Sequence, residues 1–145
     1  MKKLLFIILV VLVSLSTVET VSAEEPFIYV SFGQKAVNLN SSFLYDNIMS
    51  EALTLKVTSN CYHGSIVASM SSLKNRYGGT LRQDRIFIKT SATNGFVSLE
   101  KPVKISKPAF GSYDIIIDFL VKANSELLRA GTYGGSIAFT VMPAA

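Results

Sequence analysis

Cysteine and histidine are nearly absent from this chain of 145 residues, which carries one of each, Cys61 and His63. A single thiol cannot form an intramolecular disulfide bond. A metal site needs several His, Cys or carboxylate ligands that converge, and here the remaining ligands would have to come from scattered acidic residues. A serine hydrolase would have only His63 as its base, and no Gly-x-Ser-x-Gly motif occurs. These scarcities argue against a metal centre and against hydrolase chemistry.

Other signals are missing as well. The chain has 14 basic and 10 acidic residues without a dense Lys/Arg cluster, which argues against a nucleic-acid partner. No Gly-rich phosphate loop follows a strand pattern and opens a helix. We therefore expect no catalysis, no cofactor and no metal.

The first 23 residues have the order of a secretory signal peptide. A basic start, Met1-Lys2-Lys3, precedes ten apolar residues, Leu4 to Val13, and then the small residues Val21-Ser22-Ala23. An uncleaved membrane anchor is the alternative, but a membrane-spanning helix takes about 20 apolar residues. We expect cleavage after Ala23 and export to the periplasm, the cell surface or the medium, with the membrane involved only in export.

Residues 24–145 are expected to form one domain, since 122 residues suffice for one core. Cleavage removes two of the 14 basic residues and one of the 10 acidic ones, which leaves 12 against 9 and a net charge of +3. Cys61, as the lone thiol of an exported protein, is expected to be a small buried residue.

Alternation of apolar and polar residues dominates this domain and predicts β-strands. The longest example is Tyr113–Val121, where Asp114 and Asp118 fall on the polar face. Further strands are expected at Phe27–Phe32, Leu53–Val57, Ser65–Met70, Arg85–Thr90, Phe96–Leu99, Val103–Ser106 and Ser136–Val141.

Turn residues stand between these runs. Gly78-Gly79 predicts a tight reversal, and Asn94-Gly95 predicts a two-residue hairpin. Pro102 and Pro108 bracket a segment that suits an edge strand. Residues 124–131 suggest one helical turn, and residues 40–51 suggest a loop with a helical turn.

Seven or eight short strands with such spacing predict an all-β fold: a single antiparallel immunoglobulin-like β-sandwich. A closed barrel is the alternative.

Candidate catalytic pairs are weak. Cys61 and His63 would share one strand face, but adjacent positions on that face rarely bring a sulfur to the ring, and no third group orients them. Asp114 and Asp118 are about 13 Å apart along a strand. A glycosidase pair needs about 5 to 9.5 Å.

Two non-catalytic features remain. The run Phe27, Ile28, Tyr29, Val30, Ser31, Phe32 is apolar on both faces and is either the first strand of its own sandwich or a strand offered to a neighbouring subunit. Four basic residues surround the Gly78-Gly79 turn, either as a solvated loop or as contacts for an anionic ligand. They are Lys74, Arg76, Arg82 and Arg85.

Two segments resemble strands of bacterial surface β-sandwiches. Arg129–Val141, with its Ala-Gly-Thr-Tyr sequence, is similar to the last strand of chaperone–usher pilins and spore-coat U-like domains, and Leu53–Cys61 is similar to their second strand. The resemblance implies a surface subunit that pairs with others by strand addition. The chain differs from these pilins in two ways. They often pair the second-strand cysteine with one in the first strand, which is absent here, and their last strand commonly ends on an aromatic residue, whereas this chain ends in Met142-Pro143-Ala144-Ala145.

We therefore expect a non-catalytic, secreted or surface-associated protein with a structural or adhesive role, such as that of a pilin-like subunit. The alternative is an exported binding module that contacts an anionic ligand through the basic loops.

Overall fold

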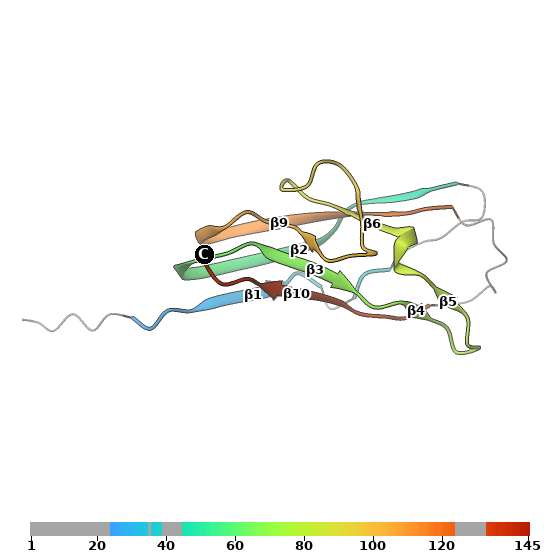
Figure 1. The fold of residues 1–145 in the computed structure, drawn as a ribbon, viewed down its shortest axis with the longest axis horizontal. Coiled ribbons are helices and arrows are strands. Elements are labelled where there is room, and N and C mark those ends of the chain that lie inside the picture. The colour runs from blue at the N-terminus through green and yellow to red at the C-terminus, as the bar shows by residue number, and fades with distance from the viewer. Residues whose placement is uncertain (1–23, 35, 39–44, 124–132) are drawn as a thin grey trace, which may run out of the picture.

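The computed structural model describes residues 24–34, 36–38, 45–123 and 133–145, and these form an all-β, sandwich-like fold of antiparallel sheets (Figure 1). A five-stranded sheet has the order β1-β2-β9-β6-β7, and a three-stranded sheet has the order β10-β3-β8. Strands β4 and β5 form a two-stranded ribbon. The described residues contain no α-helix, only the short 3-10 helix η1 (Gln83–Arg85).

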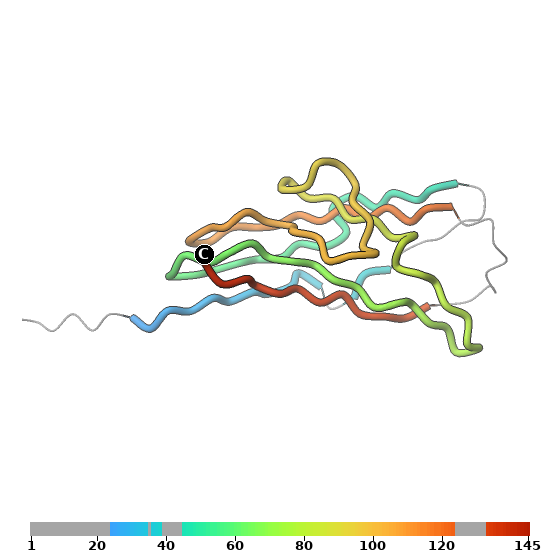
Figure 2. The backbone as a smooth tube through the Cα atoms, in the orientation of Figure 1, coloured from blue at the N-terminus to red at the C-terminus, as the bar shows by residue number. Residues whose placement is uncertain are grey.

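The strands of the larger sheet are β1 (Ile28–Phe32), β2 (Asn47–His63), β6 (Ile86–Lys89), β7 (Val97–Ser98) and β9 (Ala109–Val121). The smaller sheet contains β3 (Ile66–Met70), β8 (Val103–Lys104) and β10 (Ile137–Val141), and the ribbon contains β4 (Leu73–Lys74) and β5 (Thr80–Leu81). The continuous trace in Figure 2 shows β2 and β9 as the long central pair. No helix within the described ranges has the length and apolar character needed to cross a membrane.

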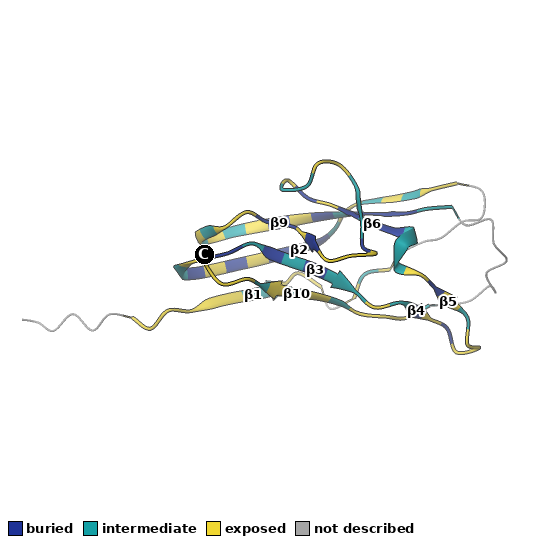
Figure 3. Ribbon diagram, viewed as in Figure 1, coloured by how far each residue is buried: buried dark blue, intermediate teal, exposed yellow. Residues whose placement is uncertain are grey.

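The core lies between the two sheets, because the inward positions of each strand are apolar. Every second residue is buried from Leu53 to Ser59 in β2 and from Ile115 to Phe119 in β9, where Figure 3 shows dark bands, and Phe119 is fully buried (Figure 3). The facing strand β3 contributes Ile66 and Ala68. The alternation expected for Tyr113–Val121 is confirmed, with inward Ile115, Ile117 and Phe119.

The structure corrects several details. The described residues contain ten strands instead of the expected seven or eight, because Leu73–Lys74 and Thr80–Leu81 form the short strands β4 and β5. Asn94-Gly95 does not form a two-residue hairpin: the loop between β6 and β7 spans 90–96, although Gly95 has the expected positive φ of 75°. The expected helical turn at 40–51 is wrong from Asn47 onward, where β2 begins. Residues 39–44 and 124–132, including the other expected helical turn, lie outside the described residues.

Two turn predictions are confirmed. Strands β4 and β5 pair across the Gly78-Gly79 turn, where Gly78 has a φ of 81°. The Asn75 side chain stabilises this turn, since its Oδ1 accepts hydrogen bonds from the amides of Tyr77 (3.0 Å) and Gly79 (2.6 Å). The segment between Pro102 and Pro108 contains the edge strand β8.

Candidate functional site: the open side of the sandwich

The two sides of the sandwich differ in how their sheet edges are covered. On one side the chain passes directly from β7 in the larger sheet to β8 in the smaller sheet. Leu99 in this link and Ile105 directly after β8 are each 1% exposed and lie in the core. Leu99 N–H donates to Ile86 O and Ile105 N–H donates to Ile66 O, both at 2.9 Å. The link therefore closes this side.

On the other side the edges are β1 and β10, which lie side by side in Figure 1. Among the described strands, β1 pairs only with β2, and β10 pairs only with β3. Phe32 of β1 and Phe139 of β10 meet across the gap between the sheets, with ring centroids 5.8 Å apart. No described strand covers either edge, so we call this the open side.

Inward-facing apolar residues are exposed along the open side. In β1, Ile28, Val30 and Phe32 pair with the inward β2 residues Ser59, Val57 and Leu55, so they share the core face. Ile28 is nevertheless 38% exposed and Phe32 53% exposed. In β10 the corresponding residues Ile137, Phe139 and Val141 are only half-buried. Figure 3 shows the contrast with β2 and β9, where inward residues are buried.

This arrangement has the chemistry of a strand-accepting groove. The outer edges of β1 and β10 present backbone N–H and C=O groups that an extended segment can pair with. The apolar side chains between the two edges can hold the alternate side chains of such a segment. The groove, defined here by Ile28, Val30, Phe32, Ile137, Phe139 and Val141, is the candidate functional site.

The predicted partner-strand residues divide between two faces. Ile28, Val30 and Phe32 line the groove, whereas Tyr29 faces outward beside Thr58 and is 65% exposed. Phe27 precedes β1 and is bound to Asn60, whose Oδ1 accepts from Phe27 N–H at 2.7 Å and whose N–H donates to Phe27 O at 3.3 Å. The segment thus pairs within its own domain in this structure; its offer to a neighbour stays a prediction.

Sequence reasoning did not identify the β10 residues as part of a functional site. The alternation of Ile137, Phe139 and Val141 predicted an ordinary half-buried strand. The strand order places β10 at an edge of its sheet, and the alternation within one strand does not reveal which strands lie beside it.

The four predicted anion-contacting residues lie on the β4–β5 ribbon and around η1. Two of them already have partners: Arg82 Nη2 is 3.1 Å from Asp84 Oδ2, and the Arg76 guanidinium lies 4.7 Å from the Tyr77 ring centroid. The Asp84 carboxylate partly offsets the charge of Arg82, whereas the neutral Tyr77 ring leaves the charge of Arg76 in place. Lys74 is exposed in β4, and Arg85 is half-buried in η1.

His63 is a buried structural residue rather than part of a pair with Cys61. It is 1% exposed, and its Nδ1 lies 2.6 Å from Gly64 O, so Nδ1–H donates there and Nε2 accepts from the Tyr113 hydroxyl at 2.9 Å. Burial raises the pKa of Tyr113, partly offset by a hydrogen bond with Ser106. Both nitrogens of the His63 ring are therefore engaged away from the thiol.

Cys61 itself is half-buried, not buried as expected, with Sγ 3.6 Å from Phe27 O. It lies in the irregular part of β2 between Ser59 and His63, where regular alternation is lost. The described residues hold no group of three or more His, Cys, Asp or Glu side chains that could bind a metal ion.

Comparison with known proteins gives no family. No family model matches the chain, and no curated protein matches it. One solved structure is similar, a family 123 glycoside hydrolase from Clostridium perfringens whose structural analysis addressed glycolipid glycan hydrolysis. The match has 16% sequence identity and a TM-score of 0.44, and it covers 79% of this chain. The chain spans 24% of the length of that protein.

Proposed function

We propose that this protein is an exported, non-catalytic β-sandwich of immunoglobulin-like kind that serves as a structural or adhesive subunit at the cell surface. Its open side accepts a β-strand from a partner subunit, which completes the sandwich in the manner of a pilin-like assembly. The observation that carries this proposal is the exposure of inward apolar residues on both edges of one side, Phe32 above all.

An added strand would be more favourable than leaving this apolar groove exposed to water. Contiguous apolar surface beside unpaired strand edges is a hazard for a monomer, and proteins usually cover or charge such edges. The six side chains that define the groove carry no charge. An incoming strand would supply backbone hydrogen bonds and bury these side chains at once.

The pairing of β1 with β2 supports a role in which β1 stays in its own domain and accepts a partner strand at its free edge. Five residue pairs join β1 to β2, and two hydrogen bonds between Phe27 and Asn60, one of them to the Asn60 side chain, extend this pairing. A donated β1 would have to give up all of these contacts. The order of basic, apolar and small residues in 1–23 supports export.

Peptide binding to the mature chain, residues 24–145, tests the proposal. The probe is a fluorescent peptide of alternating valine and threonine with lysine at both ends, and a peptide of the same composition with clustered valines is the control. We expect saturable, one-to-one binding of the alternating peptide alone, measured by fluorescence anisotropy.

Two matched variants locate the binding. Phe32→Lys places a charge in the groove, and Tyr29→Lys places one on the outer face of the same strand, where the aromatic ring is also largely exposed. Phe32→Lys should weaken binding at least about tenfold, and Tyr29→Lys should leave it nearly unchanged. Equal effects of the two variants, or no preference for the alternating peptide, would refute the strand-accepting groove.

A further inference from the structure

A second feature lies away from the groove, on the outer face of the five-stranded sheet. An open hollow of about 330 Å³ is lined by residues of β2, β6 and β9 and by the start of the loop 90–96. Its lining includes Ser50, Glu51, Lys89, Ser91, Ile116 and Asp118. The proposed strand addition uses none of these groups.

A β-bulge in β2 builds one wall of the hollow. The pairing of β2 with β9 shifts register between Met49 and Leu53, and Glu51 within the bulge has a φ of 50°. Left-handed backbone is strained for a residue other than glycine, and such strain concentrates at functional positions. Asp118 holds the bulge, because its Oδ1 accepts from Glu51 N–H at 2.8 Å.

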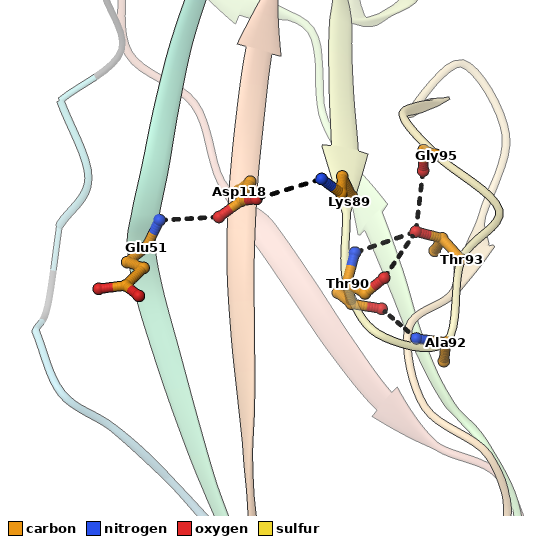
Figure 4. A network of polar contacts seen from close by, with 7 residues as sticks. All are labelled: Glu51, Lys89, Thr90, Ala92, Thr93, Gly95 and Asp118. Atoms are coloured by element: carbon orange, nitrogen blue, oxygen red, sulfur yellow. Dashed lines mark hydrogen bonds and ion pairs between the residues drawn. The ribbon is translucent and has the colours of Figure 1, made fainter.

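The opposite wall is a braced loop (Figure 4). Thr93 Oγ1 accepts from Thr90 N–H at 2.9 Å and lies within hydrogen-bond distance of Thr90 O and Gly95 O. Ala92 N–H donates to Thr90 Oγ1, which in turn donates to Ile105 O in the interior. The wall is thus formed before any ligand arrives, which lowers the entropy cost of binding.

Polar side chains of residues that line the hollow have unused hydrogen-bonding capacity. Lys89 Nζ and Asp118 Oδ2 are 3.9 Å apart, which is too far for a direct hydrogen bond but suits a bridging group. Figure 4 shows the two side chains directed toward each other. The Glu51 carboxylate has no hydrogen-bond or ion-pair partner among the described residues. A hydroxyl group, which donates and accepts, can satisfy Lys89 and Asp118 together.

The charges and the apolar surface of the hollow further limit the class of ligand that it suits. Two carboxylates and one ammonium group leave a net charge of −1, so an ion of either sign meets both attraction and repulsion. Ile116, 49% exposed, offers an apolar surface beside these polar groups. The combination suits a neutral molecule with several hydroxyls and a C–H face.

We propose that the hollow binds one sugar unit of a glycan. One hydroxyl bridges Lys89 and Asp118, a second donates to the Glu51 carboxylate, and the C–H face of the ring lies on Ile116. The proposal stands independently of strand addition, because the hollow and the groove share no residue.

Titration of the isotope-labelled mature chain by ¹H–¹⁵N NMR tests this inference. The probes are glucose, galactose, mannose and N-acetylglucosamine, each added alone, with glycine and calcium chloride as comparison ligands. We expect at least one sugar to give saturable shifts confined to the amides around Ser50, Glu51 and the loop 90–96, with a Kd in the millimolar range.

Two variants and a control complete the test. Lys89→Met and Glu51→Gln should each weaken sugar binding about tenfold. Asp114→Asn, on the same outer face of β9 but outside the hollow, should bind as the parent does. The spectrum of each variant shows whether it is folded. Absence of saturable sugar shifts, shifts elsewhere, equal binding by all three variants, or saturation by glycine or calcium in place of sugar would each overturn the proposal.

Discussion

The two sides of the sandwich differ in what joins their edge strands. On the β7–β8 side, a link of four residues, 99–102, crosses from one sheet to the other and buries Leu99 almost completely. On the β1–β10 side the two edge strands are at opposite ends of the described chain, and no direct link crosses between them. Ile28 and Phe32 therefore remain exposed although their side chains face inward.

This difference shows that an apolar inward face does not by itself make a complete core. Burial also needs a chain segment that covers the edge, and connectivity supplies it on one side only. The stability of the isolated chain should therefore depend on the centre and the closed side, whereas the open side should gain its stability from a partner.

The largest loss of stability is expected for a substitution at the centre of the sandwich. Phe119→Ala should lower the free energy of unfolding by about 3–5 kcal/mol, since a fully buried aromatic side chain is removed. Urea unfolding measures this, with Tyr29→Ala on the outer face as the control. A loss as small as that of Tyr29→Ala would mean that Phe119 does not pack between the sheets.

Isoleucine residues on the two sides give the sharpest direct contrast. Ile105→Ala on the closed side should cost about 2–4 kcal/mol, because Ile105 is 1% exposed. Ile28→Ala on the open side should cost less than about 1 kcal/mol, since its side chain is already 38% in water. Matching losses in urea unfolding would show that the open side is covered in solution.

The His63–Tyr113 pair joins β2 to β9 and offers a third, smaller effect. Tyr113→Phe removes the hydroxyl that donates to His63 Nε2 and leaves a buried acceptor unpaired. We expect a loss of about 1–3 kcal/mol in thermal or urea unfolding. A neutral result would indicate that water replaces the hydroxyl.

The smallest effect concerns pH at the end of the long strands. The Ala123 N–H donates to Asp46 at 2.7 Å and, with Lys122, lowers the pKa of this carboxyl below its ordinary 3.8, against a smaller opposing effect of desolvation. A lowered folded-state pKa adds stability above the ordinary pKa and loses it as the pH falls through the lowered value. Asp46→Asn should therefore slightly flatten the acid limb of a stability–pH curve. An unchanged acid limb would contradict this contribution.

Sequence reasoning located most strands because their inward residues alternate with polar ones, as in Leu53–Val57 and Tyr113–Val121. It missed features that depend on pairing partners. The bulge at Glu51 exists because Asp118 replaces a ladder partner, and Asp118 therefore has a structural role beyond that of a solvent-facing residue. Asn94-Gly95 lies in a longer loop because Thr90 and Thr93 bind each other.

The groove could be predicted only in part. The alternating residues of β10 and the apolar run of β1 were visible, but the strand order that leaves both at one side was not. Cys61 escaped prediction for a similar reason, since the irregular pairing after Ser59 changes which residues of β2 are covered.

Residue-resolved hydrogen exchange tests the open side most directly. The amides of β1, β3, β8 and β10 are compared in the mature chain with and without the alternating valine–threonine peptide. The account predicts that the peptide slows exchange in Ile28–Phe32 and Ile137–Val141 and leaves Val103–Lys104 unchanged. Slowed exchange at β8 but not at β1 and β10, or no slowing anywhere, would contradict a sandwich that one added strand completes.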